Sequence, residues 1–146
     1  MLPSDRGRMR AFYRQSWQAF QAGEPLEPLQ ALVSDVVGEH PEYHKQVLVD
    51  DAIVQEFSVA AGATNPFLHL GMHVALREQV GADRPAGIAL QYRKLLARIG
   101  DRHEAEHQMM ECLGQVMWAA QRSGQAPDER AFLDCVKRLR KSAGKR

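Results

Sequence analysis

Prolines and glycines divide this chain into a row of segments that each carry the apolar spacing of an α-helix. Apolar residues recur three and four positions apart within the segments, which places them on one helix face. No segment has the alternation of a strand. The sequence therefore predicts an all-α fold, a single-domain helical bundle of about five to seven helices with a central polar cavity. The expected helices cover about 5–22, 28–40, 41–48, 66–80, 83–100, 102–122 and 127–142.

The expected helix ends rest on capping chemistry. Pro66 follows Asn65 and suits a first helical position, while Asp83 and Asp101 are suitable N-caps. Gly100 suits the left-handed position after a helix. A length of 146 residues fits one domain, so we expect residues 1–146 to form one helical domain, with a loop at 49–64 and a basic flexible tail at 142–146.

Composition excludes several classes of protein. Nineteen basic and eighteen acidic side chains give a net charge of +1, so no nucleic-acid partner is expected. The chain has no apolar stretch of membrane-spanning length, so no membrane partner is expected, and its N-terminus lacks the apolar segment of a signal peptide. Cys112 and Cys135 form no CxxC pattern, which favours reduced thiols in a cytoplasmic protein. The oligomeric state is left open.

All six histidines fall in pairs with i, i+4 spacing, which places each pair on one face of a helix. The pairs are in "HPEYH", "HLGMH" and "HEAEH", and comprise His40 and His44, His69 and His73, and His103 and His107. Pro41 interrupts the first pair, so only one of its histidines is expected to face the core. Glu111 lies one turn after His107, in line with Met110, Gly114, Met117 and Trp118, which predicts an inward-facing carboxylate.

Several inward imidazoles and one carboxylate are typical of a transition-metal site. Nitrogen ligands disfavour magnesium and calcium and suit iron, zinc, copper, nickel or cobalt. The predicted metal ligands are His40, His44, His69, His73, His103, His107 and Glu111, with iron favoured and zinc or manganese as alternatives. Six imidazoles exceed a tetrahedral site, which favours an octahedral ion or two metals bridged by Glu111.

Four stretches, "HPEYH", "TNPFLHLGMH", "GDRHEAEH" and "MECLG", resemble DUF1841, a proteobacterial family of small proteins with a domain of unknown function. The resemblance covers about residues 12–132 and implies a bacterial cytoplasmic protein, without an activity. The H-x3-H and H-x3-E spacings are also similar to those of hemerythrin-like diiron bundles. Hemerythrin also uses an H-x4-acid spacing, which His73 and Glu78 match, but Glu78 lies off the inward stripe. The order of the ligands along the chain also differs from that of hemerythrin.

Three functions follow from these observations. The preferred one is a non-haem, dinuclear iron site that binds dioxygen or another small oxidant, as an oxidoreductase or a sensor. The second is a zinc- or manganese-dependent hydrolase with a metal-bound hydroxide and Glu104 or Glu78 as base. The third is a non-enzymatic interaction module in which the histidines are structural. The sequence leaves open whether the protein is an enzyme.

Overall fold

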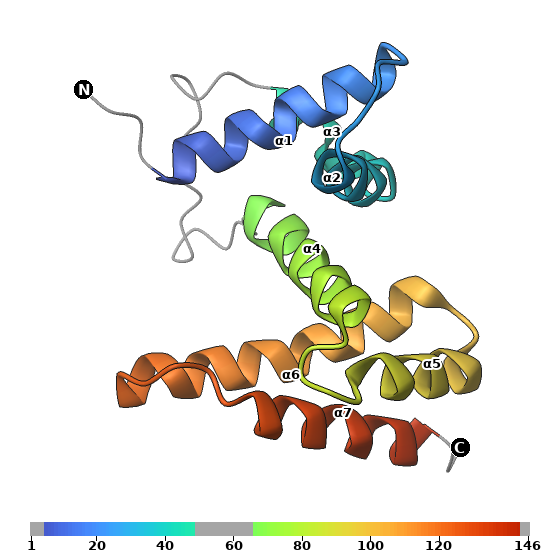
Figure 1. Cartoon of the computed structure of the whole chain (residues 1–146), viewed down its shortest axis with the longest axis vertical. Helices are drawn as coiled ribbons and strands as arrows, with labels where there is room; N and C mark the ends of the chain where they lie inside the picture. The colour runs from blue at the N-terminus through green and yellow to red at the C-terminus, as the bar shows by residue number, and fades with distance from the viewer. Residues whose placement is uncertain (1–4, 49–65, 144–146) are drawn as a thin grey trace. The chain divides into compact units, whose positions relative to one another are not determined.

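The computed structural model describes residues 5–48 and 66–143. These residues form seven α-helices and one short 3-10 helix without any strand, which confirms the all-α prediction (Figure 1). The helices are α1 (Asp5–Gln21), α2 (Pro28–Gly38), η1 (Pro41–Tyr43), α3 (His44–Leu48), α4 (Pro66–Ala82), α5 (Ile88–Ile99), α6 (Arg102–Ser123) and α7 (Glu129–Ala143).

Most helix ends lie where prolines, glycines and the Asp101 cap were expected to place them. Gly23 and Gly100 have φ of 73° and 77°, the left-handed conformation that ends α1 and α5. The exception is the start of α5, which was expected near Asp83. Asp83 instead has φ of 52°, and its carboxylate accepts hydrogen bonds from the N–H groups of Gly87 and Ala89. It shapes the turn before α5, which delays the helix to Ile88.

The chain divides into two compact units, Met1–Val74 and Ala75–Arg146, with the division inside α4. In the first unit α1 packs against α2 and α3 (Figure 1). Aromatic rings of α1 and valines of α2 surround the start of α4. This core contains Tyr13, Trp17, Val33, Val36, Val37, Val47, Phe67, Leu70 and Val74.

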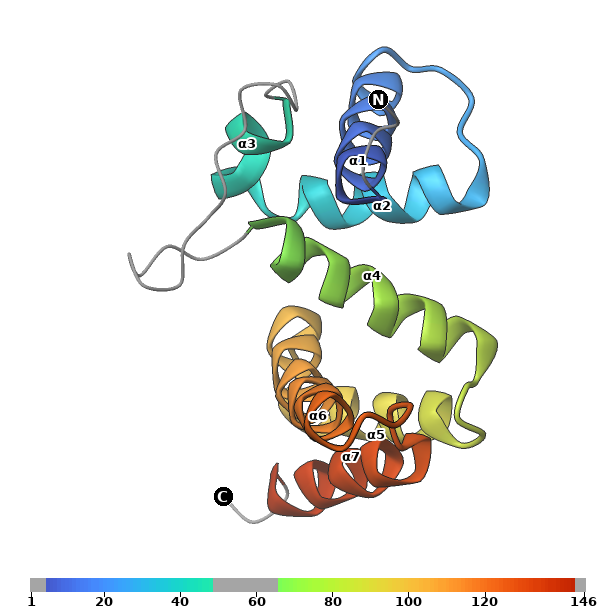
Figure 2. The same cartoon turned by 90° about the vertical axis from the view of Figure 1, so that its left-hand side faces the viewer.

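In the second unit α7 packs along α5 and α6, and both views show the three helices together (Figures 1 and 2). Its fully buried apolar side chains come from every helix of the unit. They include Leu76, Ile88, Leu95, Ala105, Met109, Phe132 and Val136. None of the described helices is both long enough and apolar enough to cross a membrane.

The expectation of reduced thiols is wrong. Cys112 of α6 and Cys135 of α7 form a disulfide, with their Cα atoms 5.8 Å apart. Both residues lie on the buried faces of their helices, and the packing of α6 on α7 brings them together. The cysteines therefore give no support for a cytoplasmic location. The loop expected at 49–64 lies outside the described residues, as does the end of the expected tail from 144 onward.

Candidate metal centre

Three histidines of the first unit lie together. His40 follows the end of α2, whereas His69 and His73 lie one turn apart near the start of α4. The centre of the His40 ring is 5.1 Å from that of His69 and 4.6 Å from that of His73. The His69 and His73 ring centres are 4.8 Å apart. His40 and His73 are fully buried and His69 is partly exposed, so the cluster borders the core and has access to solvent.

Two pairs of nitrogens in this cluster lie close enough to share one ion, His69 with His73 and His40 with His73. The Nε2 atoms of His69 and His73 are 3.2 Å apart. With metal–nitrogen bonds of about 2.05 Å, this separation corresponds to a nitrogen–metal–nitrogen angle of about 100°. Ligand nitrogens of His40 and His73 lie within 4.8 Å of each other. A hydrogen bond between the His69 and His73 rings is the other arrangement compatible with the distance.

A backbone carbonyl orients His40. The Nδ1 of His40 lies 2.8 Å from the carbonyl oxygen of Val36. The backbone N–H of His40 donates to the carbonyl oxygen of Val37. The Val36 carbonyl, which would accept from that N–H if the α-helix continued, lies next to the His40 imidazole. An Nδ1–H that donates to a carbonyl leaves the lone pair on Nε2 in the neutral ring. Histidine ligands are commonly oriented and set in one tautomer in this way.

His44 has a different role. Its Nε2 lies 2.8 Å from the carbonyl oxygen of Val37, and its ring packs against Trp17 with centres 4.6 Å apart. The 3-10 turn Pro41–Tyr43 lies between the two histidines, so their side chains have different surroundings. The sequence analysis expected only one histidine of this pair to face the core; His40 is buried and His44 is half-buried. His44 caps α2, and His40 both caps α2 and joins the cluster.

Tyr43 lies beside the three histidines. Its ring is nearly parallel to that of His40, at 5.8 Å between centres, and edge-on to that of His69 at the same distance. Burial and the neighbouring Glu42 carboxylate raise the pKa of Tyr43 above its usual value. The phenol is therefore neutral near pH 7, and its ring borders the cluster.

The second unit carries its own histidine pair at the start of α6. The ring centres of His103 and His107 are 4.0 Å apart, and their ligand nitrogens lie within 4.8 Å of each other. His103 is exposed and His107 is half-buried. Asp101 caps the helix by accepting hydrogen bonds from the N–H groups of His103 and Glu104, as the sequence predicted. The pair has the spacing of a two-nitrogen chelate on one helix face.

The prediction that Glu111 faces the core is wrong. Glu111 is exposed, as are Met117 and Trp118 on the same expected stripe. The buried face of α6 instead carries Ala105, Glu106, Met109, Met110, Cys112, Leu113 and Val116. Glu111 lies outside that face because a helix turns by about 100° per residue. Because Glu111 is exposed, its charge is solvated and does not need a metal ion to compensate for burial.

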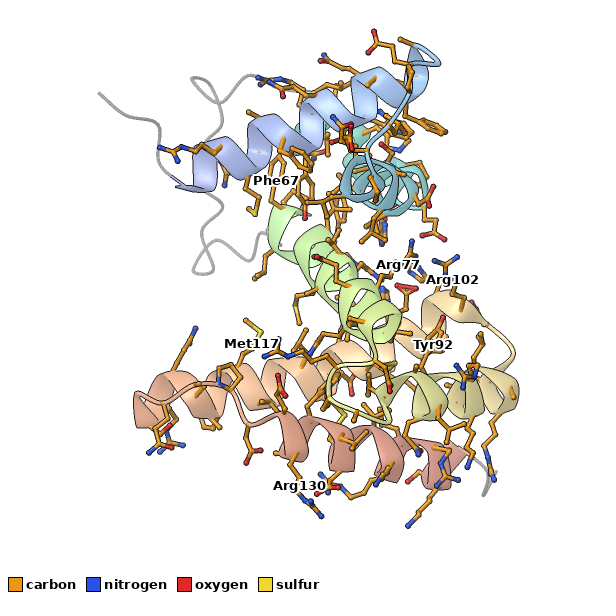
Figure 3. All side chains as sticks on the ribbon, in the orientation of Figure 1. Phe67, Arg77, Tyr92, Arg102, Met117 and Arg130 are labelled. Atoms are coloured by element: carbon orange, nitrogen blue, oxygen red, sulfur yellow. A yellow bond between two sulfur atoms is a disulfide. The ribbon has the colours of Figure 1, made fainter. Side chains whose placement is uncertain are left out.

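Glu106 is the buried carboxylate of α6, and the sequence interpretation missed it. Its side chain is 3% exposed, and its oxygens accept hydrogen bonds from Nε and one terminal nitrogen of Arg77 at 3.0–3.3 Å. Arg102 lies 3.4 Å from the same carboxylate. Arg77, Arg102 and Tyr92 lie close together in the second unit (Figure 3). Burial, followed by the Glu106 charge, raises the pKa of Tyr92.

The two carboxylates considered as bases are both exposed. Glu78 lies on the second half of α4, as the sequence indicated, away from its buried residues. Glu104 accepts a hydrogen bond from Gln108 at 3.2 Å on the surface of α6.

No protein of curated function and no solved structure is found to be similar to this chain. The likeness to hemerythrin therefore stays a similarity of ligand spacing. One family model does match, the domain of unknown function DUF1841, over residues 5–138. The match includes the first-unit histidine cluster, the His103–His107 pair and both cysteines. The chain therefore belongs to the DUF1841 family.

Proposed function

We propose that this protein binds a transition-metal ion through His40, His69 and His73, and that the ion binds a small molecule such as dioxygen. The observation that carries the proposal is the 3.2 Å separation of the His69 and His73 Nε2 atoms next to the oriented ring of His40. Three neutral imidazoles held in this way suit iron, zinc, copper or nickel.

Iron(II) is the proposed metal. Three imidazoles on a six-coordinate ion leave up to three positions for water, dioxygen or another small oxidant, which supports redox chemistry or sensing. The ring of Tyr43 packs beside His40 and His69. The version with two irons bridged by Glu111 is not retained, because Glu111 is exposed.

A zinc hydrolase is the second candidate. Three histidines and one open position form a known ligand set of catalytic zinc, in which the pKa of bound water is lowered to about 7. The same three residues would hold either metal, so the choice between the candidates rests on which ion occupies the protein.

The test is an anaerobic titration of metal-free protein with iron(II), zinc(II) and manganese(II), with optical spectra and elemental analysis. His40→Ala and His44→Ala are matched variants, since both remove a cap of α2 and only His40 belongs to the cluster. Changes outside the ligand shell already weaken metal binding by about tenfold or more, so His40→Ala should weaken binding at least that much. His44→Ala should retain the wild-type affinity.

The same titration separates the alternatives. Iron binding with absorption bands that shift on adding azide supports the oxygen or redox function, whereas spectrally silent zinc binding supports the hydrolase. No binding by any ion would reduce the His69–His73 contact to a hydrogen bond and favour an interaction module. The predicted role of His103 and His107 is tested in the double alanine variant, because a lower metal count would retain them as ligands.

A further inference from the structure

The disulfide of the second unit borders a pocket that none of the functions above uses. The pocket has a volume of about 430 Å³ and lies on the last part of α6, the α6–α7 connection and α7. Small side chains such as Ala120 and Ala131 make room for it, and Val116 contributes apolar surface. Its size is within the usual range for sites that bind small molecules.

The two cysteines differ in their access to this pocket. Cys135 lines it and retains 9% of its surface, whereas Cys112 is 1% exposed and does not line it. A small nucleophile in the pocket therefore meets Cys135 rather than Cys112. Gln115 lies beside it, with Oε1 4.0 Å from Sγ of Cys135. A disulfide sulfur has no proton to donate, so this contact becomes a hydrogen bond only after the bond is reduced.

The charged side chains that line the pocket favour an anionic ligand near Cys135. Arg138 lies three residues after Cys135 on α7, which places both on one helix face, and its side chain also lines the pocket. The acidic lining residue, Asp128, precedes α7, and its carboxylate accepts a hydrogen bond from the N–H of Ala131. The guanidinium at Arg138 can therefore pair with a carboxylate of a molecule that approaches the sulfur.

We propose that this pocket admits low-molecular-weight thiols that carry a carboxylate, and that they exchange with the disulfide at Cys135. The thiolate attacks Sγ of Cys135 and forms a mixed disulfide. The bond to Cys112 breaks, and its electron pair leaves on the Cys112 sulfur, which takes up a proton. A second thiolate attacks the mixed disulfide, releases the oxidised small disulfide and leaves Cys135 as a thiol. The chain gains two electrons and two protons in total.

The first test compares the single-cysteine chains Cys112→Ser and Cys135→Ser, folded and without denaturant. Each is mixed with the anionic disulfide 5,5′-dithiobis(2-nitrobenzoate), and the release of nitrothiobenzoate is followed by absorbance. The Cys112→Ser chain, which retains the pocket thiol, should react at least tenfold faster than the Cys135→Ser chain, whose thiol is enclosed. Equal rates, or a faster Cys135→Ser chain, would overturn the proposal. Circular dichroism is used to check that both variants are folded.

The second test uses the wild-type disulfide with 3-mercaptopropionate and with neutral 2-mercaptoethanol, followed by alkylation and peptide mass analysis. The mixed disulfide should form on Cys135, at a rate proportional to thiol concentration. The ratio of the two exchange rates, carboxylated thiol over neutral thiol, should be roughly two- to fivefold higher for the folded chain than for the urea-unfolded chain. This is the range for an exposed charge pair. Arg138→Gln should remove that gain. A rate that rises only with added urea would show a purely structural disulfide and refute the idea.

Discussion

Glu106→Gln should destabilise the second unit strongly, whereas Glu111→Gln should not. Both variants remove one carboxylate charge from α6 and keep the shape of the side chain. They differ in surroundings, because Glu106 is buried and bonded to Arg77, and Glu111 is exposed. The comparison therefore isolates what burial and pairing contribute.

The expected magnitude follows from the contacts. The side chains of Arg77 and Glu106 are 11% and 3% exposed, so water screens their interaction weakly. Removing one partner of a buried ion pair costs about 3–5 kcal/mol, since the other charge stays buried without compensation. Gln retains one acceptor oxygen, and Arg77 keeps part of its hydrogen bonding, so we expect about 3 kcal/mol for Glu106→Gln. A surface change such as Glu111→Gln is worth about 0.5 kcal/mol or less.

Urea unfolding followed by circular dichroism measures both values, with the double variant Arg77→Met/Glu106→Leu as a third chain. Replacing both partners by apolar side chains removes the uncompensated charge, so the double variant should recover most of the loss. Absorbance near 295 nm gives a second measurement. The pKa of Tyr92 should fall in Glu106→Gln, because the carboxylate that helps to raise it is gone. Equal destabilisation by the Glu106 and Glu111 variants would refute the assignment of Glu106 as the buried partner.

Three further predictions concern other parts of the chain. Hydrogen bonds from Ala89 and Gly87 lower the pKa of Asp83, so its charge stabilises the fold above its unfolded pKa and ceases to do so as pH falls through the folded pKa. Asp83→Asn should therefore lower the melting temperature at pH 7, and the difference should vanish in acid. Replacing Cys112 and Cys135, which are 23 residues apart, by serine should cost about 3 kcal/mol in urea unfolding if the cross-link restricts the unfolded chain. Free imidazoles protonate near pH 6.5, so a chelator should lower the melting temperature of metal-loaded protein at pH 7 and do much less at pH 5; equal effects would contradict histidine ligation.

The helices were predictable because their boundaries are local. Pro28, Pro66, Gly23 and Gly100 limit the helices through their own backbone preferences, which need no tertiary contact. The start of α5 failed for a local reason of another kind. Asp83 has a side chain suited to capping a helix. With its left-handed φ, the carboxylate instead accepts a hydrogen bond from Gly87 in the turn before α5.

The orientation of α6 was predicted wrongly because the histidines were taken to mark its buried face. The spacing of Ala105, Met109, Cys112 and Val116, by four, three and four, marks the face that is buried. Reading the helix from these residues would have placed Glu106 beside the core and Glu111 outside it. The pairing of Glu106 with Arg77 was beyond the sequence, since the two are 29 residues apart and their contact depends on tertiary packing.

The histidine cluster was predictable only as a group of candidates. H-x3-H spacing brought His69 and His73 together, because i, i+4 residues on one helix are neighbours. The choice of His40 over His44 depends on the turn that begins at Pro41, after which α3 packs against α1. Local rules also gave no sign of the disulfide, because it joins two separate helices.

The partner that orients His40 is a peptide carbonyl, so an alanine scan will not detect it. Every residue at position 36 supplies the same oxygen, and replacing Val36 tests only the loss of its buried side chain. The carbonyl is available because α2 ends close to it, so what a relative must preserve is the place where the helix stops. Sequences that drift at position 36 can thus keep the imidazole in register, whereas an inserted residue before Pro41 would turn it away. Deletions and insertions, rather than substitutions, are the changes to which this contact is most vulnerable.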